Sequence, residues 1–242
     1  IVAIQKELEQ NDAGVRRQSG TVLKNAATGE VIFTPPQDYE TIQNLLVNLE
    51  QYINEPNDID PLVNMAIIHY QFETIHPFYD GNGRTGRIIN ILYLILKDLL
   101  DIPILYLSSY IIQHKADYYR LLQEVRTENN WEEWVLYMLD GVEQTSLATI
   151  ELIEGIYKLM NESKEKIKSE LPKIYSKDLV EILFMHPYTK IDFLVEELGL
   201  HRHTASKYLN ELEKINIMKS IKIQNSKFFI NEKLFDMLKK GI

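Results

Sequence analysis

The sequence predicts a mainly α-helical protein with one β-hairpin near its start and a small α+β domain at its end. Apolar residues recur at helical spacing over most of the chain, and the few β-type runs are short and flank turns. The net charge is −9, yet residues 190–242 hold ten Lys and Arg against seven Asp and Glu. We therefore expect two domains, residues 1–169 and 170–242.

The first predicted elements are a short helix over residues 2–8 and a β-hairpin over about 21–34. Residues 21–23 and 31–33 have the pattern of paired strands around a turn at 26–29, and two prolines then end the second strand. A short hairpin on a helical protein either covers core or pairs with a partner strand. The residues alone leave both alternatives open.

Two amphipathic helices follow, over residues 39–53 and 62–75. The second leads directly into His76, and its apolar residues fall on one side: Met65, Ile68, Phe72 and Ile75. Two helices that bury each other would give His76 a rigid mount. His69 lies on the same helix and is left without a role, because a lone histidine there is usually a core residue.

The segment from His76 to Arg87 reads HPFYDGNGRTGR and leads into an apolar helical run over residues 88–100. Its glycines allow positive φ and a close approach of backbone N–H groups to an anion, which the helix N-terminus also favours. Arg84 and Arg87 put two guanidinium groups on one side of that helix. A plain turn between two core helices needs neither arginine, so the pattern favours a polyphosphate site.

Two side chains of this loop can supply chemistry. Asp80 offers the oxygen ligand that Mg²⁺ prefers beside phosphates. His76 titrates near neutrality and is suited to take a proton from an attacking hydroxyl.

The same segment resembles the Fic family motif, H-x-F-x-[DE]-G-N-G-R-x-x-R, and every defined position is matched. The resemblance implies a Fic-type helical core whose hairpin, the flap, aligns a target segment over the active site. It also implies transfer of AMP from ATP to a hydroxyl of a target protein, with His76 as general base, Asp80 as magnesium ligand and Phe78 as a buried anchor. The rest of the loop would hold the nucleotide, with the last residue on the γ-phosphate: Gly81, Asn82, Gly83, Arg84, Thr85, Gly86 and Arg87.

Related reactions and regulation stay open. One branch of the family transfers phosphate and has lysine in place of Gly83, so Gly83 favours AMP transfer, while removal of AMP uses a similar loop.

Many members of the family inhibit themselves with a glutamate in an S/T-x-x-x-E-G/N pattern. Glu154 and Gly155 match its end, but Ile150 replaces the Ser or Thr. The chain begins at Ile1 rather than methionine, so we expect the natural protein to extend upstream, where an inhibitory helix would lie.

Past the loop, residues 115–126 are predicted to form a helix. It contains a Tyr-Tyr-x-x-Leu element, beginning at Tyr118, similar to one that closes the nucleotide pocket in the family. Tyr118 is the predicted adenosine or ribose contact, although core packing is the commoner role of such a ring. Trp131 and Trp134 are predicted to pack, and residues 147–169 to form the last core helix.

Residues 170–242 resemble a winged helix-turn-helix domain, with helices expected at 174–185, 191–198 and 201–215 and strands at 217–223 and 227–230 around a turn at 224–226. On DNA, the third helix and the wing would offer His201, Arg202, His203, Thr204, Ser206, Lys207, Lys222 and Lys227. An excess of three positive charges is slight for gripping phosphates. Protein docking or homodimerisation is therefore favoured over DNA binding.

Composition sets outer limits. The chain has no cysteine, which excludes disulfides and thiolate metal sites, and its longest apolar run, residues 88–96, is too short to cross a bilayer. We expect a cytoplasmic protein without a membrane segment. Two hypotheses remain: a magnesium-dependent protein adenylyltransferase that uses ATP, and a nucleotide-sensing transcription regulator with a degenerate core. The intact His76 favours the enzyme, because a sensor needs no base.

Overall fold

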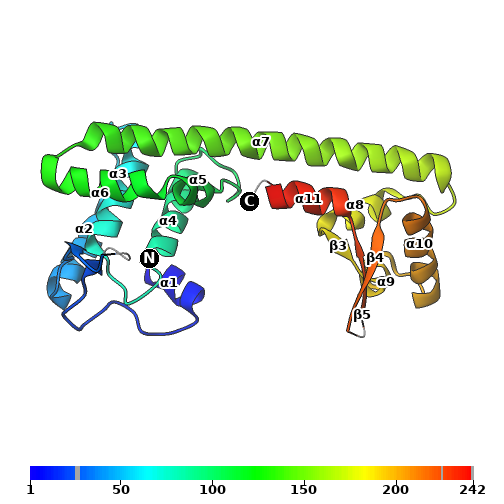
Figure 1. Cartoon of the computed structure of the whole chain (residues 1–242), viewed down its shortest axis with the longest axis horizontal. Coiled ribbons are helices and arrows are strands. Elements are labelled where there is room, and N and C mark those ends of the chain that lie inside the picture. Colours follow the sequence, from blue (N-terminus) through cyan, green and yellow to red (C-terminus); the bar gives the residue numbers. More distant parts are fainter. Residues whose placement is uncertain (25–27, 225, 241–242) are drawn as a thin grey trace. The chain divides into compact units, whose positions relative to one another are not determined.

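The computed structural model describes residues 1–24, 28–224 and 226–240, and the protein is mainly helical, as predicted (Figure 1). It has two compact units, Ile1–Ser146 and Leu147–Ile242. The division falls inside one long helix, α7, Trp131–Glu170. The domain boundary expected after residue 169 stays a prediction. The division after Ser146 lies earlier in the chain than this boundary because the second half of α7 packs with the second unit, where Ile167 is buried in the core.

The first unit begins with α1, Val2–Glu9, and a hairpin of β1, Leu23–Lys24, with β2, Val31–Phe33. The two strands are antiparallel, as predicted. β1 begins two residues later than expected, and the register shifts within it. Of the predicted turn, Ala26 and Ala27 lie outside the described residues.

The middle of this unit is built by α2, Tyr39–Asn54, α3, Pro61–Ile75, and α4, Asn82–Leu96. Asp38 and Asp60 cap α2 and α3 by accepting hydrogen bonds from backbone N–H groups of the first turns. α4 ends four residues earlier than predicted, just before a left-handed residue at position 98, where φ is 55°.

The central helix of the first unit is α3. Its predicted apolar side is fully buried, and other residues around the helix are buried as well, including the polar Asn64, His69 and Glu73. α4 packs along α3 and α2 packs beside it. A helix buried on most sides is a rigid support for the residue that follows it, His76.

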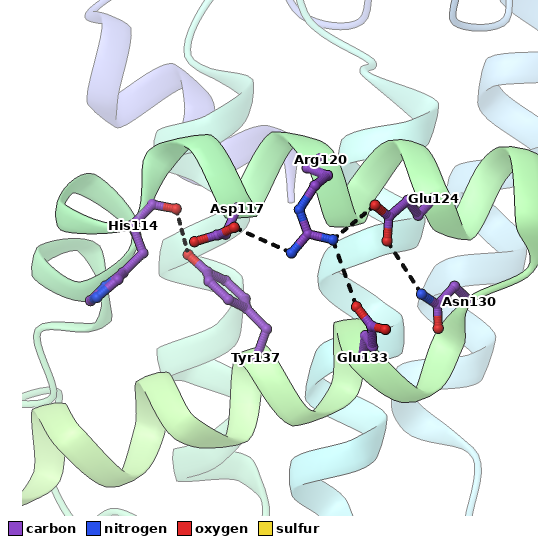
Figure 2. Close-up of polar contacts among 7 residues, drawn as sticks. All are labelled: His114, Asp117, Arg120, Glu124, Asn130, Glu133 and Tyr137. Carbon is purple, nitrogen blue, oxygen red and sulfur yellow. Dashed lines mark hydrogen bonds and ion pairs between the residues drawn. The ribbon is translucent and has the colours of Figure 1, made fainter.

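Two further helices cover this core: α5, Leu107–Gln113, which was not predicted, and α6, Lys115–Glu128. α6 and the start of α7 lie side by side (Figure 2). Arg120 of α6 bonds Asp117 and Glu124 on its own helix and reaches Glu133 of α7 at 3.6 Å. Because Arg120 is half exposed, water screens these pairs and each contributes little to stability.

α7 is one continuous helix of 40 residues, whereas a separate helix was expected over residues 147–169. No proline interrupts it. The helix also continues through Gly141. Glycine suits this position because α7 approaches α5 closely there: a Cβ on Gly141 would lie 2.7 Å from the Tyr110 ring.

The second unit packs α8, Lys177–Met185, α9, Ile191–Leu198, and α10, Arg202–Lys214, around buried leucines and Phe229. Ser176 caps α8, so this helix begins three residues later than predicted. A three-stranded antiparallel sheet of order β3–β5–β4 and a last helix complete the unit: β3, Tyr188–Thr189; β4, Lys219–Ile223; β5, Ser226–Ile230; and α11, Glu232–Lys240.

The three helices and the hairpin of β4 and β5 match the predicted winged domain, whereas β3 and α11 were not predicted. β3 has only two residues, too few for a recognisable pattern. Ser226, expected in the turn, begins β5, and Asn225 lies outside the described residues. Among the described helices of both units, none combines the length and apolarity that crossing a membrane requires.

Candidate active site

His76 ends α3 in the left-handed conformation, with φ 47° and ψ 58°. This conformation is uncommon for a residue with a side chain and needs support from its surroundings. Arg16 gives that support: its Nε donates to the His76 carbonyl oxygen at 2.9 Å, and its backbone N–H donates to the Pro77 carbonyl at 2.9 Å. The Arg16 guanidinium also donates to the carbonyl of Pro36, at the end of the flap.

Arg16 is fully buried and was not predicted as a site residue. Its partners are 20 and 60 residues away along the chain, so no local pattern points to it. In the folded protein it joins the flap to the start of the loop.

The surroundings of His76 keep its imidazole neutral. The pKa of His76 is lowered to about 4, below the near-neutral value expected from the sequence. Burial is the largest cause, the positive charges of Arg16 and Arg126 add to it, and the backbone of Glu73 opposes it. At pH 7 the ring is therefore able to accept a proton. The side chain is half buried and keeps some access to solvent.

Asn82 shapes the loop with its side chain. Its amide oxygen accepts from the Phe78 N–H at 2.9 Å, and its amide nitrogen donates to the Phe78 carbonyl at 2.8 Å. Phe78 is fully buried, as the predicted anchor, and packs against Phe72. The Asn82 side chain is thus engaged in closing the loop, and only its backbone N–H remains for an anion.

The anion site expected from the sequence lies at the N-terminus of α4. Gly81 precedes the helix with φ 79°, and its carbonyl accepts the first helical hydrogen bond, from Thr85 N–H at 2.9 Å. The N–H groups of Asn82, Gly83 and Arg84 therefore come before that first bond, and such groups can bind an anion.

The two arginines stand on the first two turns of α4. Arg84 is exposed and pairs with Glu9, at the end of α1, at 2.5 Å. Arg87 is half buried, and its Nε donates to Ser108 Oγ at 2.9 Å. Both arginines line an otherwise mostly apolar groove of about 320 Å³.

Neither Thr85 nor Gly86 faces solvent, and Gly86 lies against α3. Both are buried, and a Cβ on Gly86 would lie 2.8 Å from Glu73 Oε1 and 3.0 Å from the Phe72 ring. Glycine is needed here because α3 and α4 approach closely. A phosphate contact of these two residues stays a prediction.

Asp80 is exposed at the edge of the loop, where one of its oxygens accepts from Gly81 N–H at 2.7 Å. No group of three acidic or histidine side chains that could hold a metal occurs in residues 1–24, 28–224 and 226–240. A lone carboxylate beside an anion site still fits Mg²⁺, which usually binds one or two carboxylates together with phosphates and water.

Tyr118 lies in the core. Its hydroxyl is 2.9 Å from Nε2 of His69, whose Nδ1 is 3.0 Å from the amide of Asn90. Only 4% of Tyr118 is exposed, whereas its neighbour Tyr119 is half exposed. This burial supports packing, the commoner of the two roles considered for Tyr118, and the nucleotide contact stays a prediction. Trp134 is fully buried, as expected, and donates to the carbonyl of Ala66.

The flap rests beside the end of α3. The Arg126 guanidinium of α6 stacks on Phe33 of β2, 3.8 Å from the ring centroid, and also contacts Thr74. Arg126 thus connects β2 with Thr74 of α3, two residues before His76. A flap placed over the site stays a prediction.

The fold and the site define a helical protein with a histidine at the start of a glycine-containing loop that ends at a helix N-terminus. Comparison with known proteins agrees. The Fic/DOC family model matches residues 1–94, and the model described as "Protein adenylyltransferase SoFic-like, C-terminal domain" matches residues 159–234. The chain therefore carries a Fic/DOC family domain in residues 1–94 and a SoFic-like C-terminal domain in residues 159–234.

Several curated relatives share part of this sequence. A probable protein adenylyltransferase of Aquifex aeolicus (strain VF5) is 37% identical over 79 residues, which cover 33% of this chain and 24% of the relative. Protein adenylyltransferase fic-1 of Caenorhabditis elegans is 39% identical over 59 residues, covering 24% and 11%. Protein adenylyltransferase Fic of Drosophila grimshawi is 30% identical over 106 residues, covering 42% and 20%. The chain thus matches at most about a quarter of the length of these relatives.

A solved structure shares the fold. A Fic family protein from Desulfovibrio desulfuricans G20 superposes with a TM-score of 0.54 at 21% identity, covering 95% of this chain and 67% of the other.

Proposed function

We propose that this chain transfers AMP from ATP to a hydroxyl side chain of a target protein. One observation carries the proposal: a neutral, half-buried His76 stands at one end of the loop whose other end is the N-terminus of α4, with Arg84 and Arg87 beside it. Phosphate-group transfer needs mostly positioning and charge neutralisation, and this arrangement supplies both. The names of the relatives support the same reaction.

In the proposed reaction, the backbone N–H groups at the start of α4 and the two guanidinium groups bind the phosphates. Asp80 would hold Mg²⁺, which when bound neutralises phosphate charge. His76 accepts the proton of the target hydroxyl as its oxygen forms a bond to the α-phosphorus. The bond from the α-phosphorus to the bridging oxygen breaks, pyrophosphate leaves, and the proton remains on His76.

The proposed target segment pairs with the flap, since an extended segment can add to the edge of a short hairpin. Arg126 contacts Phe33 of this flap, and Arg16 contacts the Pro36 carbonyl just after it. Strand pairing uses main-chain hydrogen bonds more than side-chain contacts. The register of the pairing would therefore decide which hydroxyl residue of the target lies at the active site.

For the C-terminal domain, we propose a protein partner. Two of the four cations considered for DNA binding are paired with acids: Arg202 with Asp192, and Lys227 with Glu213 at 3.7 Å. Neutralised cations contribute little to binding a phosphate backbone. The domain would then select the target or pair two copies of the chain.

Incubation with Mg²⁺ and α-labelled ATP tests the proposed reaction, with His76→Ala and γ-labelled ATP as controls. Label from the α-position on protein, absent in the variant, is the expected result. Transfer from the γ-position would instead indicate phosphate transfer. Loss of AMP from a previously modified target, without any transfer to fresh target, would indicate the removal reaction.

A further inference from the structure

Glu73 is a buried carboxyl group that the proposed reaction does not use. It lies on α3, one turn before His76, and only 8% of its surface is exposed. Its Oε1 has no hydrogen-bond partner among the described residues. A buried carboxyl oxygen without a hydrogen-bond partner is costly, so its presence at this position needs a reason.

The place of this carboxyl group is beneath the start of α4. Glu73 Oε1 would be 2.8 Å from a Cβ on Gly86 and 3.8 Å from a Cβ on Gly83. Nη1 of Arg87 is 3.2 Å from that same point at Gly83. The carboxyl group and the guanidinium therefore both lie close to Gly83, in the first turn of α4.

The charged and titratable groups around Glu73 come from three helices. Arg87 of α4 and Arg126 of α6 lower the pKa of Glu73, but burial outweighs them and raises it to about 7. His69 and His76 share α3 with Glu73, and burial lowers the pKa of each to about 4. Burial raises the pKa of Tyr118, on α6, well above its ordinary value. Glu73 is therefore the member of this group that changes charge near neutral pH.

We propose that Glu73 is a positioning residue that acts as the resting counter-charge of Arg87, and that a nucleotide phosphate replaces it by driving a proton onto its carboxylate. Arg87 is held at Nε by Ser108, which leaves its η nitrogens for one anion or the other. A phosphate on those nitrogens adds negative charge close to Glu73 and favours its neutral form. This inference rests on the proposed nucleotide site and adds a proton to the binding step.

The sign of the effect follows from this linkage. Below pH 7, Glu73 is already neutral, so affinity for the nucleotide does not depend on it. Above pH 7 the carboxylate must take up a proton when the phosphate binds, and affinity falls by up to about tenfold per pH unit. Glu73→Gln is neutral at every pH and nearly the same shape, so it binds without proton uptake and, at pH 8.5, up to about thirtyfold more tightly than the parent chain.

The test is calorimetric binding of α,β-methylene-ATP with saturating Mg²⁺ at pH 6.5, 7.5 and 8.5. This analogue replaces the bond that AMP transfer would break. Each titration is run in two buffers of different ionisation enthalpy, which counts the protons taken up. Glu40→Gln, an exposed carboxylate on α2, is the matched control.

We expect proton uptake in the parent chain and in Glu40→Gln at pH 7.5 and above, and none in Glu73→Gln. Weaker binding by Glu73→Gln at pH 8.5, or uptake that persists in it, would overturn the inference. If that variant does not fold, the parent chain decides alone, since binding without uptake at pH 8.5 also overturns the inference. Absence of any binding would overturn it together with the proposed function, whereas AMP transfer with pH-independent binding counts against the inference only.

Discussion

The two units of this protein treat polar residues differently. The first unit buries Arg16, His69 and Glu73, of which the last two lie on α3. In the second unit, no ionisable side chain among the described residues is buried. Charged pairs of the second unit, such as Arg202 with Asp192, lie at its surface. Buried charge is costly and is retained where it shifts pKa values or fixes geometry. The contrast supports chemistry in the first unit and recognition in the second.

The largest expected effect is on the rate of transfer. His76→Ala removes the proposed base, and we expect the initial rate of AMP transfer to fall by about 10²–10⁴-fold. The matched change in the second unit is His186→Ala, which removes an exposed histidine and should leave the rate unchanged. Initial rates with α-labelled ATP measure both. A rate within a few-fold of the parent chain for His76→Ala would remove His76 from the chemistry.

A second comparison sets a buried arginine against an exposed one. Arg16→Ala leaves the carbonyls of His76 and Pro36 without their donor, and we expect the free energy of unfolding of the first unit to fall by about 3 kcal/mol. Arg202→Ala breaks an exposed pair and should cost less than about 1 kcal/mol.

Denaturant unfolding distinguishes the two variants. Both tryptophans, Trp131 and Trp134, lie in the first unit, so their fluorescence follows that unit alone. Circular dichroism follows the helices of both units. Equal losses for Arg16→Ala and Arg202→Ala would remove the proposed contrast.

Sequence reasoning found what is local and missed what is distant. The loop was found because its function requires consecutive residue types, and the long helices because their apolar periodicity extends over several turns. The support of His76 by Arg16 joins residues 60 positions apart, and no pattern within one window contains it. Asn82 was expected to help hold the phosphates, and its role in closing the loop around Phe78 through its side chain was not foreseen, because an amide can serve either purpose. The elements that were missed, α5, β3 and α11, are short or lie at the end of the chain.

The buried ionisable groups of the first unit make its stability depend on pH. Burial lowers the pKa of His69 and of His76 to about 4, so between pH 6.5 and 4 the unfolded chain binds their protons and the folded chain does not. Stability is therefore lost as the pH falls through this range. Glu73 acts in the opposite direction, because its pKa is raised to about 7 and the folded chain holds its proton between about pH 4.5 and 7.

Glu73→Gln removes the opposing contribution. Between pH 6.5 and 4.5 we expect its free energy of unfolding to fall more steeply than that of the parent chain, by about 1.4 kcal/mol per pH unit. Denaturant unfolding followed by tryptophan fluorescence at pH 5, 6 and 7 measures the difference. Parallel curves for the two chains would mean that Glu73 does not hold its proton in the folded state.

The smallest effect separates the two roles considered for Tyr118. Tyr118→Phe keeps the ring and removes the hydroxyl that lies 2.9 Å from His69 Nε2. If the ring only packs, as its burial supports, the first unit loses about 1 kcal/mol of stability and the affinity for α,β-methylene-ATP stays unchanged. If the hydroxyl contacts the nucleotide, affinity falls as well. Tyr119→Phe, at a half-exposed neighbour, controls for a general change of the helix surface, and a loss of affinity confined to Tyr118→Phe would restore the nucleotide contact.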